Sequence, residues 1–351
     1  MKKFINYLIV VNLTLLMFYL ASLIGIFRTF LHTINRIIII PMAFGIFLAY
    51  ILKPVYRKLI HKKLRATLAI FLVFMMFFSV LSIIIFIFGR YIYIQGQDSI
   101  VMLQDYVGKI QLDTYIDRVI EQEYMHNIIN NISRLILTKF QDIFMSIKGI
   151  FNEGLLVFSD ILLVILIAIY TLKDENKIRS NIESIVPSKY STVTKEILDK
   201  SDEILGDYIL GQFYVALSLA TMIFIGYKII RMPSAILLAS ITFVLAFIPF
   251  VGFFISMIIP YIFAVVKGPI MVFKLTILFI ISQTVKGRIV VPMVMGRAMK
   301  MHPITDIFLV VIAANIFGPI GAFTVVPIYS LLKMIFYTLK KHRVINSKKY
   351  C

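Results

Sequence analysis

The chain has 351 residues, 60% of them hydrophobic, with a mean hydropathy of +0.93 and a formal net charge of +18. So much apolar surface cannot be buried inside a water-soluble domain, and it requires hydrocarbon around it. No basic stripe lies on a soluble, aromatic-bearing segment, so we expect no nucleic-acid partner, and we expect the excess Lys and Arg to meet the anionic headgroups of a lipid bilayer.

Ten apolar segments follow one another along the chain. They cover residues 4–27, 37–52, 67–89, 154–172, 208–230, 234–249, 251–267, 270–286, 304–318 and 320–339. A full span needs about 20 apolar residues, and three segments (37–52, 234–249 and 304–318) are shorter, with Pro or Gly in or beside each. We predict an all-α polytopic membrane protein with about eight transmembrane helices and additional Pro/Gly-broken or re-entrant segments.

Acidic residues are almost confined to one stretch. Every Asp and Glu except Asp306 lies between Asp98 and Asp207, while the flanking apolar blocks carry mostly Lys and Arg. We divide the chain accordingly into N-terminal transmembrane helices at 1–90, an extracytoplasmic helical insert at 91–153, a transmembrane helix with a cytoplasmic amphipathic helix at 154–207, a C-terminal transport core at 208–339 and a basic cytoplasmic tail at 340–351.

The basic residues set the predicted orientation. The loop at 53–65 holds six Lys and Arg residues and should therefore face the cytoplasm. The first apolar segment is long for a signal peptide and has no small-residue cleavage site before Arg28, so we interpret it as a retained helix. Counting spans from the basic loop predicts a multi-pass protein of the bacterial cytoplasmic membrane with cytoplasmic N- and C-termini.

The two polar segments carry their own helical patterns. Apolar residues spaced between Ile110 and Ile120 predict amphipathic helices in the outer insert. Thr194 is a candidate N-cap for an inner helix that carries Ile197, Leu198, Ile204 and Leu205. We expect that inner helix to lie along the inner surface of the membrane.

Pro249 and Gly252 stand three residues apart between two apolar arms. Proline removes a backbone donor, and glycine lets the chain reverse. Such a break frees carbonyl groups, which are tolerated at membrane depth only against protein or a water-filled cavity. The pattern fits a hairpin whose tip lines a substrate pathway, and it fits equally an ordinary tight loop at the membrane surface.

A second group of polar residues occupies 283–288. Gln283 and Thr284 lie on an otherwise apolar arm, where buried amide and hydroxyl groups require partners and are suited to bind a polar solute. Lys286 and Arg288 are suited to hold an anionic or hydroxylated solute, or to extend toward headgroups at a helix end. We place all four in the candidate substrate pathway.

His302 and Asp306 are the candidate ion-coupling residues. Their four-residue spacing puts them on one face of a helix. The histidine fits a proton switch or a structural hydrogen bond. The aspartate is a functional group if it lies within the apolar span, and a charge matched to the helix dipole if it lies at the interface.

Asn315, Gly318 and Gly321 mark a second broken region, which also contains Pro319 and Pro327. It parallels the break at Pro249, as expected for the discontinuous helices of transporters. We add these three residues to the candidate substrate pathway.

Motifs of common enzymes are missing from the sequence. It has no phosphate-cradling Gly-Lys-Ser/Thr loop, no paired-histidine metalloprotease motif and no Gly-x-Ser-x-Gly elbow. Its five histidines are scattered, and its one cysteine is Cys351. We therefore expect no enzyme, no metal site, no disulfide and no cofactor.

Several motifs recur together in the C-terminal half, and one precedes them. They are Lys53-Pro54, Tyr208-Ile209-Leu210-Gly211-Gln212, Ile248-Pro249-Phe250-Val251-Gly252, Gln283 with Pro292, Gly296 and His302-Pro303, and Gly318-x-x-Gly321 with Pro327. In this order and spacing they resemble the autoinducer-2 exporter family of bacterial membrane proteins. The resemblance covers most of the chain, and its best motifs lie in 205–330.

The resemblance implies an oligomeric membrane transporter of about eight helices. Members are associated with export of the quorum-sensing signal autoinducer-2, others are described as sodium or proton antiporters, and a sporulation-associated group exists. This chain departs from the family pattern, because Lys286 and Arg288 stand where Glu and Asn are frequent, and Ala246 and Phe247 stand where an Asn often precedes the Ile-Pro pair.

Our first hypothesis is a secondary transporter or exporter of a small polar solute, such as autoinducer-2 or another metabolite, which works by alternating access, with protons or sodium as the candidate coupling ions. We expect it to form a homo-oligomer in the lipid bilayer. The alternative is a non-transporting membrane protein with a structural or partner-binding role in sporulation or envelope assembly, which the two basic departures favour.

Overall fold

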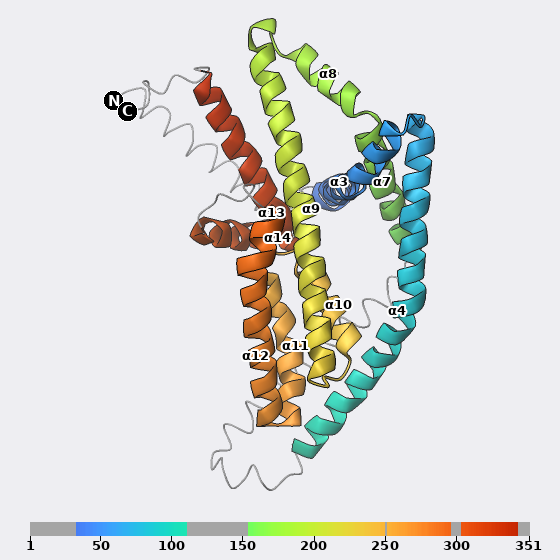
Figure 1. Cartoon of the computed structure of the whole chain (residues 1–351), viewed down its shortest axis with the longest axis vertical. Helices are drawn as coiled ribbons and strands as arrows, with labels where there is room; N and C mark the ends of the chain where they lie inside the picture. The colour runs from blue at the N-terminus through green and yellow to red at the C-terminus, as the bar shows by residue number, and fades with distance from the viewer. Residues whose placement is uncertain (1–32, 111–153, 250, 296–302, 343–351) are drawn as a thin grey trace, which may run out of the picture.

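The computed structural model describes residues 33–110, 154–249, 251–295 and 303–342, and every regular element within them is a helix (Figure 1). In chain order these are η1 (Asn35–Ile39), α3 (Ile40–His61), α4 (Ala66–Ile110), α7 (Gly154–Lys173), α8 (Glu175–Ile185), η2 (Ser188–Tyr190), α9 (Ser191–Ile229), α10 (Ala235–Leu245), α11 (Val251–Lys267), α12 (Pro269–Val285), η3 (Lys286–Val290), α13 (Val291–Met295) and α14 (Pro303–Lys341). η1 and η3 are short π-helical turns and η2 is a 3₁₀ turn.

Five helical stretches in the described part of the chain are long and apolar enough to cross a membrane. They are Asn35–His61, Ala66–Tyr91, Ser188–Ile229, Pro269–Met295 and Ile304–Lys341. α10 and α11 are shorter apolar helices, and α7 is an apolar helix of 20 residues. This architecture confirms the prediction of an all-α polytopic membrane protein.

Two predicted elements take a different form. The segment expected at 37–52 continues through Pro54 to His61, so α3 reaches 22 residues instead of forming a half-length helix. The predicted N-cap at Thr194 is wrong, because α9 begins at Ser191 and the Thr194 hydroxyl donates to the Tyr190 carbonyl at 3.1 Å within the first turn. The apolar residues assigned to a separate inner helix belong to α9, and α8 is the separate amphipathic helix.

α9 is the central element, and it connects two helical groups (Figure 1). Its apolar half buries Leu219, Ile223 and Tyr227 against α10, α11 and α12. α3, α4 and α7 form a second core that includes Ala49 and Ala168. A third core joins α3, α9 and α14. Helices that are apolar on all sides pack this way when hydrocarbon surrounds them.

Large apolar side chains also cover the outside of the molecule. Examples are Phe71 and Phe86 on α4, Phe273 and Ile280 on α12, and Phe308 on α14. In water such a surface would drive association, whereas in a bilayer it contacts acyl chains at no cost. The outward residues therefore agree with a membrane-embedded chain.

Candidate functional site

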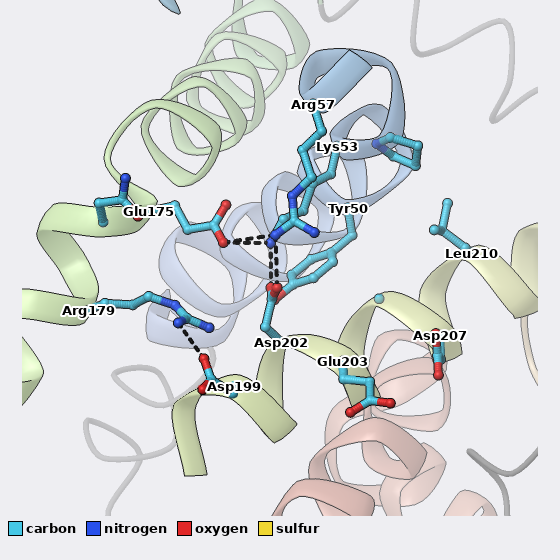
Figure 2. Close-up of a pocket in the computed structure, with 13 residues that line it drawn as sticks. Tyr50, Lys53, Arg57, Glu175, Arg179, Asp199, Asp202, Glu203, Asp207 and Leu210 are labelled. Atoms are coloured by element: carbon cyan, nitrogen blue, oxygen red, sulfur yellow. Dashed lines mark hydrogen bonds and ion pairs between the residues drawn. The ribbon is translucent and has the colours of Figure 1, made fainter. Parts of the chain in front are cut away.

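A cavity of about 600 Å³ lies between α3, α8 and α9 (Figure 2). Its lining is mostly charged, which is unusual beside apolar helices. The lining residues are Tyr50, Lys53, Pro54, Arg57, Glu175, Asn176, Arg179, Asp199, Asp202, Glu203, Gly206, Asp207 and Leu210. Five carboxylates and three cationic side chains therefore meet around one cavity, which is suited to a small polar solute.

A cluster of ion pairs joins the three helices across one side of the cavity. Lys53 Nζ binds Glu175 Oε1 at 3.1 Å and also pairs with Asp202. Arg57 Nη2 lies 3.1 Å from Glu175 Oε1 and 3.2 Å from Asp202 Oδ2. Lys53 and Arg57 can share both partners because residues four apart lie on the same face of a helix.

Two further pairs hold α8 against α9. Arg179 Nη1 donates to Asp199 Oδ1 at 2.6 Å, and this hydrogen bond raises the pKa of the Arg179 guanidinium above its ordinary value. Lys195 Nζ lies 3.8 Å from Glu183 Oε2. α8, which forms one wall of the cavity, is thus held to α3 and α9 by ion pairs of Glu175, Arg179 and Glu183.

α9 has a charged first half and an apolar, membrane-spanning second half that begins near Tyr208. The charged half lies outside the membrane. It carries seven charged residues, namely Lys195, Glu196, Asp199, Lys200, Asp202, Glu203 and Asp207. Glu196 accepts hydrogen bonds from Lys200 at 2.8 Å and Lys341 at 3.0 Å, and it lies 2.6 Å from His342 Nε2. Hydrogen bonds from Lys200, His342 and Lys341 lower the pKa of Glu196 to about 2. The contacts of Lys341 and His342 hold the end of α14 against the charged half of α9.

Tyr50 forms the base of the cavity. Its hydroxyl donates to Asp202 Oδ1 at 2.8 Å, as Figure 2 shows. A Cβ at Gly206 would lie 3.7 Å from the Tyr50 ring, so α9 passes close to the ring at this glycine. On its other side the ring belongs to the third core, with Tyr208 and Val310. Tyr50 therefore separates the charged cavity from the buried centre of the protein.

The first predicted break lies at that centre. α10 ends at Leu245 and α11 begins at Val251, and a Cβ at Gly252 would stand 1.7 Å from the Leu245 carbonyl oxygen. Only glycine allows this approach. Pro249 is buried in the turn, and the buried Gln212 of α9 donates its side-chain amide to the Ala246 carbonyl at 2.6 Å. The amide satisfies a carbonyl that the break releases from the helix.

The second predicted break divides α14. Gly318 has a φ of 69° and a ψ of −159°, which is not helical and favours glycine. A Cβ at Gly321 would lie 2.4 Å from the Ala313 carbonyl oxygen, so the two arms of α14 approach closely. Both breaks are therefore real interruptions with glycine at the point of closest approach.

An aromatic cluster joins the two breaks. The ring of Phe247, in the first break, lies 6.1 Å from the ring of Phe323, which follows the second. Phe47 of α3 contacts both rings, at 5.4 Å and 5.0 Å between centroids. All three contacts are edge-to-face, the geometry that aromatic pairs favour. The structure thus brings the predicted Pro249–Gly252 and Gly318–Gly321 regions together.

Asp306 is 3% exposed in the first turn of α14, and the described residues provide no hydrogen-bond partner for its Oδ1 atom. The Tyr208 hydroxyl is also buried without such a partner. His302 lies outside the described residues.

The remaining predicted residues are spread over α12, η3 and α14. Gln283 is half-buried, and its Oε1 atom has no hydrogen-bond partner among the described residues. Lys286 Nζ lies 5.7 Å from the centre of the Phe253 ring, next to the first break. Thr284 and Arg288 are exposed. Asn315 is exposed as well, and it donates to the Val311 carbonyl of its own helix at 2.9 Å.

The sequence interpretation missed the cavity and most of its lining. The sequence analysis includes Lys53-Pro54 as a motif and places the acids of 174–207 in one polar segment. The spacing of these residues does not indicate that Lys53 pairs with Glu175 or Asp202. Gln212 likewise belonged to a recognised motif, without a signal that it binds the Ala246 carbonyl. These relationships depend on helices far apart in the chain.

Known proteins resemble the chain along almost all of its length. Residues 8–341 match the family described as AI-2E family transporter. The putative transport protein YueF of Bacillus subtilis is 28% identical over 93% of this chain and 90% of its own. YrrI of the same organism, also named a putative transport protein, is 26% identical over 86% of both chains. The putative transport protein MJ1177 of Methanocaldococcus jannaschii is 26% identical over 60% of this chain and 62% of its own.

The match over nearly the whole chain agrees with the helical architecture, the paired helix breaks and the polar cavity beside them. Transport, and not catalysis, is what the family description and the relatives' names share. The chain belongs to the AI-2E transporter family and is a multi-pass membrane transporter.

Proposed function

We propose that the protein moves a small polar solute, autoinducer-2 or a chemically similar hydroxylated metabolite, across the bacterial cytoplasmic membrane by alternating access. The cavity between α3, α8 and α9 is the cytoplasmic mouth of the path. The single observation that supports this assignment is the double position of Tyr50, which lines a charged cavity of about 600 Å³ and also belongs to the apolar cluster that contains Ile248 and Ala322, next to the two helix breaks. Transporters bind solutes at such interrupted helices.

The chemistry of the walls supports a polar, hydrogen-bonding solute. Glu203 and Asp207 line the cavity and have no ion-pair partner among the described residues, whereas Lys53, Arg57 and Arg179 are all paired. Carboxylates accept hydrogen bonds from hydroxyl groups and attract cations. The mouth is therefore better suited to hydroxylated or cationic solutes than to anions.

The ion pairs supply a closing mechanism. Lys53 and Arg57 attach α3 to Glu175 of α8 and to Asp202 of α9, while the Tyr50 hydroxyl binds the same aspartate. A path from the cavity to Tyr208 and the helix breaks opens only if these contacts separate. Arg57 is 53% exposed, so water can replace its two ion pairs as they separate, which is compatible with repeated cycles of opening.

Asp306 is the proposed coupling group. It is a buried carboxyl group with an oxygen that has no hydrogen-bond partner among the described residues, one helical turn before Val310, which packs with Tyr50 and Tyr208 in the third core. An acid in an apolar environment is costly, and binding a proton or a sodium ion removes that cost. Binding of that cation would favour one of the two states of alternating access, and its release would favour the other.

The test uses Gly206, which lines the cavity opposite Tyr50. Gly206→Phe fills the space with a ring, whereas Gly206→Ala adds a methyl group at ordinary contact distance, 3.7 Å from the Tyr50 ring. Both variants and the parent chain are reconstituted in sealed vesicles, and the release of loaded autoinducer-2 is measured with and without proton and sodium gradients.

We expect Gly206→Phe to lose flux by about tenfold or more, equivalent to roughly 1.4 kcal/mol in the barrier, and Gly206→Ala to stay within about twofold of the parent. A folded Gly206→Phe protein with parental flux would exclude the cavity as the path. A parent protein that releases no autoinducer-2 would exclude that solute.

A further inference from the structure

α8 (Glu175–Ile185) presents an apolar stripe that nothing in the described structure covers. Ile178, Ile182 and Ile185 are 46%, 39% and 81% exposed. Their spacing of four and then three residues places them on one face of the helix. The rest of α8 is polar, so the helix is strongly amphipathic.

A different face of α8 is already occupied. Glu175, Arg179 and Glu183 follow one another at four-residue intervals, and they pair with Lys53 and Arg57 of α3 and with Asp199 and Lys195 of α9. These ion pairs set the rotation of the helix about its own axis. The isoleucine stripe lies beside the ion-paired face, roughly a quarter turn around the helix, and its residues do not line the cavity.

The position of α8 brings the stripe to the membrane boundary. α7 ends at Lys173, and α8 begins at Glu175, with only Asp174 between them. Hydrogen bonds from Asp174 N to Tyr170 O at 2.9 Å and from Ile178 N to Asp174 O at 2.8 Å keep this corner tight. In Figure 1, α8 runs from the end of α7 across to the beginning of α9, at an oblique angle to the long helices α4 and α9.

The neighbouring surface of α7 is apolar up to the corner. Ile161, Leu162, Leu166 and Tyr170 are all exposed, which is the pattern of a helix that faces acyl chains. The isoleucine stripe begins eight residues beyond Tyr170, around the tight corner. It therefore follows the exposed apolar residues of α7 closely along the chain.

We propose that α8 lies in the headgroup–acyl boundary of the bilayer, with Ile178, Ile182 and Ile185 inserted among the lipids. Amphipathic helices at the end of a membrane span bind in this way. Lys173, Lys177 and Lys189, all exposed around the helix, favour anionic headgroups. Three isoleucines offer far less than the roughly 800 Å² per partner of a stable protein interface, so lipid is the better occupant than a second copy.

This placement gives the lipid surface a role at the cavity. The helix that inserts its isoleucines into the boundary also supplies Glu175, Asn176 and Arg179 to the cavity wall. Contact of the isoleucines with lipid therefore helps to hold α8 in place as a wall of the cavity. The lipid contact itself does not depend on the proposed solute or on transport.

The chain contains no tryptophan, so one introduced tryptophan reports on a single position. Ile182→Trp places the indole on the apolar stripe. Ser180→Trp is the matched control, because Ser180 is also exposed and lies two residues away, on nearly the opposite side of the helix. Ile185→Trp, at the most exposed of the three positions, is the second variant should Ile182→Trp fold poorly.

Each full-length variant is reconstituted in phosphatidylcholine vesicles with and without phosphatidylglycerol, and with acyl chains brominated either near the headgroup or near the methyl end. We expect the stripe variants to show blue-shifted emission and to lose most of it to bromine near the headgroup, with less quenching by deep bromine. Ser180→Trp should instead be quenched by aqueous acrylamide. Phosphatidylglycerol should increase the lipid quenching of the stripe variants.

Two results would overturn the proposal. One is equally weak quenching of the stripe and control variants by brominated lipid, with both quenched by acrylamide, which would place α8 in water. The other is a stripe tryptophan protected from both brominated lipid and acrylamide, which would show that protein covers the isoleucines. Both readouts are made on folded protein that elutes as the parent does from a sizing column.

Discussion

The Tyr50 hydroxyl donates a 2.8 Å hydrogen bond to Asp202 across 152 positions of the sequence. Asp202 also forms ion pairs with Lys53 and Arg57, so one carboxylate binds three side chains of α3. On the other side of its ring, Tyr50 packs with Tyr208 in the core that reaches α14. The bond therefore connects the charged cavity to the centre where the broken helices meet.

Tyr50→Phe removes this hydrogen bond and keeps the ring. We expect the free energy of unfolding in detergent to fall by about 1 kcal/mol, because Asp202 retains its cationic partners. Flux should persist, since the ring that separates the cavity from the centre is still present. Tyr56→Phe, on the same helix, is the control. Thermal unfolding followed by circular dichroism measures the difference, and equal melting temperatures for parent and Tyr50→Phe would contradict the structure.

Lys53→Met and Asp202→Asn test the ion pair between α3 and α9. In a double-mutant cycle we expect a coupling free energy of about 1–3 kcal/mol, because the two side chains are largely shielded from water. Lys58, an exposed lysine of α3 without an ion pair among the described residues, provides the control substitution Lys58→Met. Additive effects of Lys53→Met and Asp202→Asn would show that the two residues do not interact.

Gly252→Ala tests the close packing at the first break. The added methyl group would meet the Leu245 carbonyl oxygen at 1.7 Å, so the two arms must separate. We expect a loss of roughly 3 kcal/mol or more, or failure to fold. Gly287→Ala is the control, because nothing lies within 4 Å of its added methyl group. The folded fraction is measured by size-exclusion chromatography in detergent, and a Gly252→Ala protein as stable as Gly287→Ala would rule out the tight hairpin.

Asp306→Asn tests the proposed coupling group. The amide keeps the shape of the carboxyl group but binds neither a proton nor a sodium ion, so we expect gradient-driven flux to fall by about tenfold or more. Stability should stay equal or rise, because a buried charge is removed. Asp160→Asn, at an exposed position on α7, should behave as the parent. Parental flux with an unchanged response to proton and sodium gradients would remove Asp306 from the mechanism.

Much of the architecture was predictable from local sequence. Runs of about 20 apolar residues identify membrane helices, because each helix satisfies its own backbone hydrogen bonds and only its side chains meet the lipid. Pro249, Gly252 and Gly318 marked the interruptions for a similar reason, since the backbone limits of proline and the freedom of glycine belong to single residues. The expected separate helix after Thr194 failed because the charged segment joins the following apolar one without a proline.

The sequence by itself thus determined a membrane-embedded chain of helices and the places where two of them break. The tertiary structure alone decided that both breaks meet at Phe47, that Gln212 binds the Ala246 carbonyl, and that a polar cavity ends on Tyr50. Hydropathy and backbone geometry determine where a helix forms or breaks, and both are properties of stretches of about 20 residues or fewer. The choice of Asp202 as the partner of Lys53 and Tyr50 depends on how α3 and α9 pack, and no local pattern records that packing.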